Sequence, residues 1–167
     1  MNIVVERGDR ANARLRDAAF LASWRELEAA TPWSSLFQGP DYCMAWYEAY
    51  ADRHEPLLVL SDGETLDGLL PLALVDGRLC HPGDHQCEYQ GWLARPEVGE
   101  DFAAAAVRAA LAESREGTWI WPCLAPGAPT GWIESLGAGA ATVQGRDCPL
   151  VDVRDEAFLE SKGKGRL

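Results

Sequence analysis

Positive charge is scarce in this chain. Lys and Arg together number 15 against 26 Asp and Glu, so the formal net charge is -11 at pH 7. The acidic residues are spread along the whole sequence, whereas a nucleic-acid surface needs a basic face. The composition therefore predicts that nucleic acid is not a partner.

Long apolar runs are also missing. The longest one, residues 66–75, is interrupted by Asp67, Gly68 and Pro71, and it is shorter than the roughly 20 residues that span a bilayer as a helix. The first residues, MNIVVERGDRANARLRD, lack the apolar core of a signal peptide. We therefore expect no membrane span and no secretion signal.

The cysteines show no metal-finger or disulfide spacing. There are five, an odd number, and no two form a C-x-x-C pair; they are Cys43, Cys80, Cys87, Cys123 and Cys148. Scattered thiols of this kind are typical of a reducing compartment. Together with the absent signal peptide, this predicts a cytoplasmic protein.

The familiar motifs of nucleophilic and nucleotide-dependent enzymes are absent as well. The sequence contains no G-x-S-x-G elbow, no P-loop and no G-x-G-x-x-G turn. The sequence is, however, rich in apolar residues: 47% of its 167 residues are hydrophobic. A chain of this size and composition is long enough for one domain with a sizeable core.

Periodicity and turn residues predict the elements. Asp76-Gly77 is a strong two-residue hairpin signal, and the alanine-rich stretch after residue 97 is the clearest helix. We expect strands at 3–6, 57–60, 66–75, 78–81, 87–94, 118–124 and 141–153, and helices at 17–30, 40–51, 97–116, 129–136 and from 155. This order predicts a mixed α/β (α+β) domain whose mostly antiparallel central sheet is flanked by helices.

Three segments carry a family resemblance. They are WRELEAATPWSSLFQGPDYCMAWYEAY, PLLVLSDGETLDGLLPLAL and HQCEYQGWLA. In this order they resemble the amino-terminal half of CelD/BcsL-type acetyltransferases, which are related to Fem-type aminoacyltransferases. The resemblance implies the GNAT (Gcn5-related N-acetyltransferase) fold over residues 1–154. Residues 155–167 would then be the start of a linker or second half, and this start would be truncated.

The resemblance also implies a reaction. Members of this family join two GNAT-like halves, and the complete enzyme would move an acyl group from acetyl-CoA or another acyl-CoA to an amine or hydroxyl. The acceptor would be a small molecule or sugar used in polysaccharide or cell-envelope biosynthesis. In this interpretation the present half binds the acceptor and supports its twin, and is inactive alone.

The usual phosphate-binding turn of a GNAT enzyme is not recognisable here. At the corresponding place, residues 93–102 read LARPEVGEDF, with one glycine and acidic residues at Glu97, Glu100 and Asp101. Carboxylates repel a pyrophosphate, and the glycines that let the backbone approach it are missing. We therefore expect no acyl-CoA cofactor site in this half.

The segment CHPGDHQCE, residues 80–88, is the densest group of His, Cys and carboxylate residues. Its spacing matches no zinc pattern, so a metal site is disfavoured against a solvated loop. The loop could instead bind substrate, because loops on rigid scaffolds often carry function. The acceptor-binding prediction, guided by the resemblance, falls on His85, Glu88, Tyr89 and Gln90. His85 and Glu88 could also form a general acid/base pair.

Two tryptophans two residues apart, Trp119 and Trp121, would lie on one face of the strand expected at 118–124. Packing in the core is the plain interpretation; an aromatic wall for a sugar or acyl chain is the alternative. At the level of the whole chain, two other functions stay open. One is a non-catalytic binding or scaffolding module that pairs with another chain, and the other is a stand-alone acetyltransferase with an unusual CoA loop.

Overall fold

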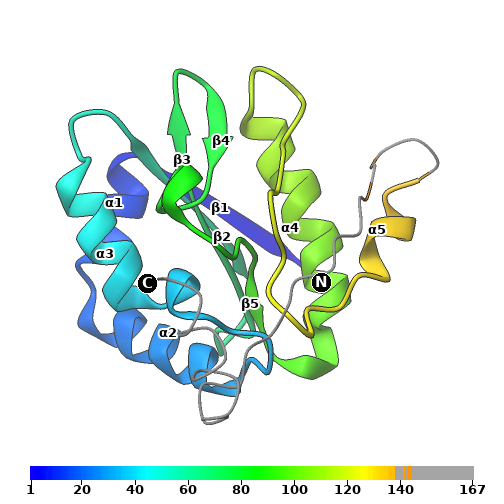
Figure 1. Cartoon of the computed structure of the whole chain (residues 1–167). Helices are drawn as coiled ribbons and strands as arrows, with labels where there is room; N and C mark the ends of the chain where they lie inside the picture. Colours follow the sequence, from blue (N-terminus) through cyan, green and yellow to red (C-terminus); the bar gives the residue numbers. More distant parts are fainter. Residues whose placement is uncertain (138–140, 142, 144–167) are drawn as a thin grey trace, which may run out of the picture.

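A five-stranded sheet forms the centre of the molecule (Figure 1). The computed structural model describes residues 1–137, 141 and 143. The strands are β1 Ile3–Arg7, β2 Glu55–Ser61, β3 Gly68–Val75, β4 Arg78–Cys80 and β5 Leu93–Ala94. Their order is β1-β2-β3-β4, with β5 paired to β3.

Every pairing in this sheet is antiparallel. The expected meander of three strands is confirmed as β2, β3 and β4. Asp76 and Gly77 connect β3 to β4, and both have positive φ, 54° and 86°. A two-residue hairpin with a type I′ turn needs this conformation at both central positions, so the turn prediction is also confirmed.

Helices cover both faces of the sheet. They are α1 Asp9–Leu15, α2 Ala18–Ala30, α3 Pro40–Ala49, α4 Gly99–Glu113 and α5 Trp132–Ser135. The side chain of Asp17 caps α2 by accepting from the backbone N–H of Ala19 at 2.9 Å. Helix α1 was not expected from the sequence, because only Ala11 and Leu15 of this short polar helix are buried.

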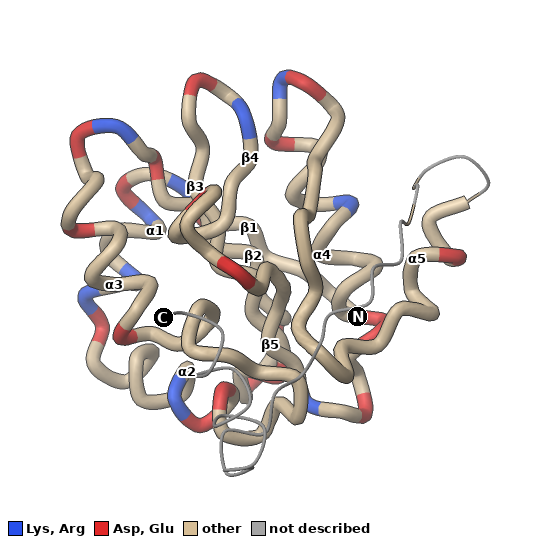
Figure 2. Tube along the Cα trace, in the orientation of Figure 1, with Lys and Arg blue, Asp and Glu red and all other residues tan. Residues whose placement is uncertain are grey.

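The two faces of β2 divide the core into two clusters. Leu57 and Val59 lie on the α4 side, and Leu58 and Leu60 lie on the side of α1, α2 and α3. Side chains alternate between the faces of a strand, so a strand buried on both sides must be apolar throughout. No residue of β3 is charged, and Figure 2 shows the charged residues mainly on the loops and helices around the sheet.

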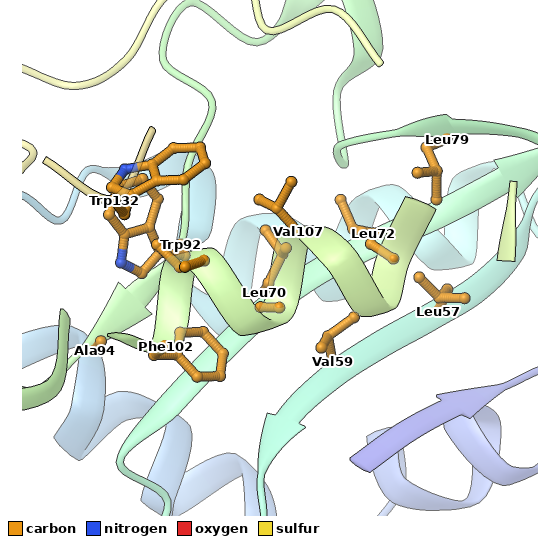
Figure 3. Close-up of a cluster of buried hydrophobic side chains, with 14 of the residues drawn as sticks. Leu57, Val59, Leu70, Leu72, Leu79, Trp92, Ala94, Phe102, Val107 and Trp132 are labelled. Carbon is orange, nitrogen blue, oxygen red and sulfur yellow. The ribbon is translucent and has the colours of Figure 1, made fainter. Parts of the chain in front are cut away.

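Helix α4 sits tightly against the sheet (Figure 3). Phe102 is fully buried, and its ring occupies the place where a Cβ on Gly68 would lie, 2.3 Å from the nearest ring atom. Glycine at the start of β3 therefore permits the close approach of α4. This contact fixes the position of α4 in the same core cluster as the tryptophans of the neighbouring loops.

Of two further expected strands, one forms only at its end and the other does not form. Of residues 87–94, only Leu93–Ala94 belongs to a strand, and residues 118–124 contribute a single parallel bridge between Leu124 and Gln90. Pro122 cannot donate to a strand ladder, and Ile120 is 80% exposed, so the segment is not the buried strand that its bulky residues suggested.

The remaining expectations have mixed outcomes. The short helix expected at 129–136 is present as α5, and the long helix ends at Glu113, three residues early. The strand expected at 141–153, the helix from 155 and the boundary between 154 and 155 lie outside the described residues. The mixed α/β class with an antiparallel sheet is shown.

Candidate functional site

His81 is the most unusual polar residue of the described chain. It follows β4 directly and exposes 2% of its surface. Its ring stacks on Trp119 with 4.9 Å between ring centroids and 26° between planes. It meets the ring of Trp121 edge-on at 5.0 Å. The imidazole is thus enclosed by aromatic surface.

Neither nitrogen of the His81 ring has a hydrogen-bond partner. Burial disfavours the charged ring and lowers the pKa of His81 to about 3; the nearby Gln90 side chain and Gly91 backbone oppose this shift. These two neighbours lie close to the ring without reaching hydrogen-bond geometry. His81 is therefore neutral at pH 7, and neither its donor nor its acceptor has a partner of good hydrogen-bond geometry among the described residues.

The cover over His81 is the segment 116–122, which we call the tryptophan strap. It is fixed at both ends: the N–H of Arg115 donates to the Gly77 carbonyl at 3.0 Å, and the N–H of Gln90 donates to the Cys123 carbonyl at 2.8 Å. Within the described part of the chain, no hydrogen bond joins residues 119–121 to the rest. The strap is held by its ends and by ring contacts.

Gln90 connects the strap to the loop predicted to bind substrate. It is buried, and its side-chain amide donates to the Asp84 carbonyl at 3.1 Å. Its backbone forms the parallel bridge with Leu124. Helix α4 lies between Gln90 and Leu124 in the sequence. The bridge therefore brings the two ends of the connection through α4 together beside His81.

The other predicted residues lie further out. His85 and Glu88 are exposed, and among the described residues no hydrogen bond or ion pair joins them. Tyr89 is half-buried; its carbonyl accepts from Gln38 at 2.7 Å, and its ring lies 6.5 Å from that of Phe37. The structure thus brings Gln90 to His81 and leaves His85 and Glu88 on the surface.

The thiols near this loop are not activated. Burial raises the pKa of Cys80 and of Cys87 to about 12, so both are protonated at pH 7 and poor nucleophiles. Among the residues that the structure describes, no three His, Cys, Asp or Glu side chains are arranged to hold a metal ion.

The N-terminus of α4, where the family resemblance would place the phosphate-binding turn, is covered by the chain itself. The indole of Trp33 lies 2.6 Å from the place of a Cβ on Gly99, and the Trp92 indole N–H donates to the Gly99 carbonyl at 3.1 Å. Glu100 accepts from the N–H of Gly131 at 3.1 Å. Aromatic rings and acidic side chains thus occupy this helix end.

A polar cavity of about 550 Å³ lies elsewhere, between the loop from α3 to β2, the β3–β4 turn and the end of α4. Its walls include Arg7, whose guanidinium binds Glu55 at 2.9 Å and Glu113 at 3.0 Å. These ion pairs raise the pKa of Arg7 and lower that of Glu55. None of the predicted site residues lines it, and its main cation is already paired.

In comparisons with known proteins, no family model, curated protein or solved structure matches the chain. None of the described helices is long and apolar enough to cross a membrane.

Sequence reasoning did not single out His81 as a functional residue. It lies in CHPGDHQCE, the segment considered and disfavoured as a metal site. Its distinguishing property is burial without a hydrogen-bond partner, which depends on a strap about 40 positions later in the chain. The one signal in the sequence was the pair of alternating tryptophans, for which an aromatic wall was the alternative interpretation.

Proposed function

We propose that this chain is the acceptor-binding half of a GNAT-type acyltransferase. A second GNAT-like half, or a partner chain, would hold acyl-CoA, and the acyl group would pass to an amine or hydroxyl of a sugar or related small molecule. A cytoplasmic location, which the scattered thiols favour, is part of this proposal. The family resemblance of the three quoted segments supplies the reaction class.

The observation that carries the assignment of a binding role is His81. A buried polar group without a hydrogen-bond partner costs roughly 1–3 kcal/mol, so such groups are uncommon unless they serve a function. Here the unpaired ring lies beneath half-exposed Trp119 and Trp121 and beside Gln90. Aromatic surface with a few polar groups is typical of small-molecule sites.

The covered N-terminus of α4 supports the assignment of the acceptor to this half and of acyl-CoA to the other. A pyrophosphate there would have to displace Trp33 and approach Glu100 and Asp101, which lie in the first turn of the helix. Helix N-termini favour anions through free N–H groups and the dipole, but adjacent carboxylates cancel much of that attraction. Acyl-CoA is therefore assigned to the other half.

His81 would act as a hydrogen-bonding residue in this scheme. A group with a pKa of about 3 is too weak a base to take a proton efficiently near neutral pH. It can still accept a hydrogen bond from an acceptor amine or hydroxyl and orient it. The general base for attack on the thioester would come from another group.

Two titrations of the same protein test the proposal. Intrinsic tryptophan fluorescence is followed while amino sugars and methyl glycosides are added, and melting is followed with acetyl-CoA. We expect a saturable fluorescence change with at least one acceptor and no melting shift with acetyl-CoA. A ligand at a hundred times its Kd would add about 2.7 kcal/mol, or roughly 5–10 °C here.

A Trp119→Ala variant locates the fluorescence signal, and Ile120→Ala is the matched control because its side chain points to solvent on the same strap. The acceptor response should be lost in the first and kept in the second. A clear acetyl-CoA shift would overturn the proposal in favour of a stand-alone enzyme. Absence of binding by the whole acceptor panel would also contradict it.

A further inference from the structure

The edge of the His81 ring, where its two nitrogens lie, is the part that a ligand can bond. Trp119 stacks on a face of the imidazole, with 4.9 Å between ring centroids. We infer that the acceptor presents a primary amine at this edge and donates its hydrogens to acceptor atoms of His81, Gln90 and Gly91. The inference rests on the proposed function, because it specifies the acceptor that is bound at the same site.

Hydrogen bonds hold Gln90 close to His81. The backbone N–H of Asp84 donates to the His81 carbonyl at 2.9 Å, and the side-chain amide of Gln90 donates to the Asp84 carbonyl at 3.1 Å. The backbone N–H of Gln90 donates to the Cys123 carbonyl at 2.8 Å. Gln90 is therefore bound both to the turn that begins at His81 and to the end of the strap that covers it.

Oxygen atoms of Gln90 and Gly91 lie near the ring nitrogens. Both residues oppose the fall in the pKa of His81, as acceptors close to its N–H groups do. Among the hydrogen bonds between described residues, none is accepted by the Gln90 side-chain oxygen or by the Gly91 carbonyl. The amide nitrogen of Gln90 is used on Asp84, so its oxygen is the atom left for the ring edge.

Acceptors outnumber donors at this edge. A neutral imidazole supplies one N–H and one lone pair, and Gln90 and Gly91 add an oxygen each. Even when the His81 N–H bonds to one oxygen, the other oxygen and the lone pair still need hydrogens. A neutral primary amine supplies two, whereas a hydroxyl supplies one. With both hydrogens bound, the lone pair of the amine is left for attack on a thioester.

Access to this edge needs only movements of rings. His81 is 2% exposed, so a ligand must displace part of its cover. Residues 119–121 make no hydrogen bond to other described residues, and their rings can therefore shift without breaking one. Trp119 can keep its stacking contact, because the nitrogens lie in the plane of the imidazole and the contact is on its face.

Charge alone would select a different set of ligands. The chain carries a net charge of -11 and attracts cations in general, and an ammonium group over Trp119 or Trp121 also gains a cation–π contact. Neither effect needs an N–H group. A trimethylammonium group retains both effects and has no hydrogen to donate, so charge and donors can be varied separately.

Matched sugars test the inference on the unaltered protein. The methyl glycosides of glucosamine and galactosamine are compared with those of glucose and galactose, and with the N-trimethylated form of each amino sugar. Tryptophan fluorescence gives the Kd values at physiological ionic strength, which screens long-range attraction. We expect an amino sugar to bind about fivefold or more tightly than its parent sugar and its trimethylated form, the value of one additional hydrogen bond.

Two variants assign this preference to the ring edge. Gln90→Met keeps the length of the side chain and removes its oxygen, so the preference should largely disappear. His81→Phe removes both nitrogens and should abolish it. Gln86→Met is the matched control, because Gln86 is exposed in the same loop and the preference should stay unchanged. Melting curves establish that each variant is folded before binding is measured.

The possible failures are distinguishable. Equal binding of an amino sugar and its parent would overturn the inference and leave the proposed acceptor site standing, with a hydroxyl as the acceptor group. Equally tight binding of the trimethylated sugar would also overturn it, because charge would then select the ligand. A preference retained in both Gln90→Met and His81→Phe would place the amine elsewhere. If no sugar binds, the proposed function fails and the inference fails with it.

Discussion

The tryptophans on the α4 side of the sheet form two groups that differ in how their polar atoms are used. In the first group, the indole N–H groups of Trp33, Trp92 and Trp132 donate to backbone carbonyls at 3.0, 3.1 and 3.0 Å. In the second, those of Trp119 and Trp121 make no hydrogen bond within the described residues. The first group therefore links loops to the core through hydrogen bonds. The second group contacts the core only through its rings.

The same difference holds for burial. Trp92 is 1% exposed and lies within 6.0 Å of the rings of Trp33, Trp121 and Trp132. Trp119 is only partly buried and rests on His81. A buried ring with a satisfied N–H contributes more to the stability of the fold than a partly buried ring whose N–H has no partner among the described residues. Neighbouring aromatic residues can thus have separate roles.

The largest effect that tests this comparison is expected from the first group. Trp92→Ala removes a buried indole and leaves the Gly99 carbonyl without its donor, so unfolding in urea should require about 3–5 kcal/mol less free energy. If Trp92→Ala costs less than about 1 kcal/mol, the first group is not the structural one.

The next effect depends on pH. The folded pKa of His81, about 3, lies below its unfolded value near 6.5. Between these values the unfolded chain binds one more proton, so the contribution of neutral His81 is lost as the pH falls from about 6.5 towards 3. Charged neighbours are Asp84 and Arg78, which pair with each other.

His81→Phe removes this titration. Relative to the unaltered protein, the variant should gain about 2 kcal/mol more at pH 5 than at pH 7, since one pKa unit is about 1.4 kcal/mol. Urea unfolding at the two pH values measures the difference, and carboxylates common to both proteins cancel. An unchanged difference would show that His81 is not protonated on unfolding in this range.

The smallest effect belongs to the strap. Trp119→Ala should lower the free energy of unfolding by about 1 kcal/mol or less, because the ring is half-exposed and its loss lets water reach the unpaired nitrogens of His81. The same urea experiment measures it beside Trp92→Ala. Equal losses in the two variants would erase the distinction between the groups.

Much of the fold follows from local sequence signals. Asp76-Gly77 has the residues that a type I′ turn requires, and the alanines of α4 have high helix propensity whatever surrounds them. The strap was not predictable in this way. Trp119, Ile120 and Trp121 alternate like a strand, but a strand also needs a neighbour with free backbone groups. β5 is only two residues long, so most of the segment remains unpaired.

The site depended even more on tertiary contacts. Gln90 was predicted from its loop, and the structure places it beside His81, but the same prediction included His85 and Glu88, which face solvent. Nothing in the sequence around His81 distinguishes it from His85. The difference comes from Trp119, which the crossover through α4 brings back over one histidine and not the other.

The Gly77 carbonyl accepts two hydrogen bonds, and this affects how residues 116–122 can move. It accepts from the Arg115 N–H at 3.0 Å and from the Ser114 hydroxyl at 3.4 Å, so the chain entering residue 116 is pinned to the β3–β4 turn. At the other end, the carbonyl of Cys123 is held by Gln90. Loop motions in folded proteins fall in the ns–μs range, and fixed ends limit how far residues 116–122 can move. Motion of this segment relative to the sheet is therefore expected to be fast and of small amplitude.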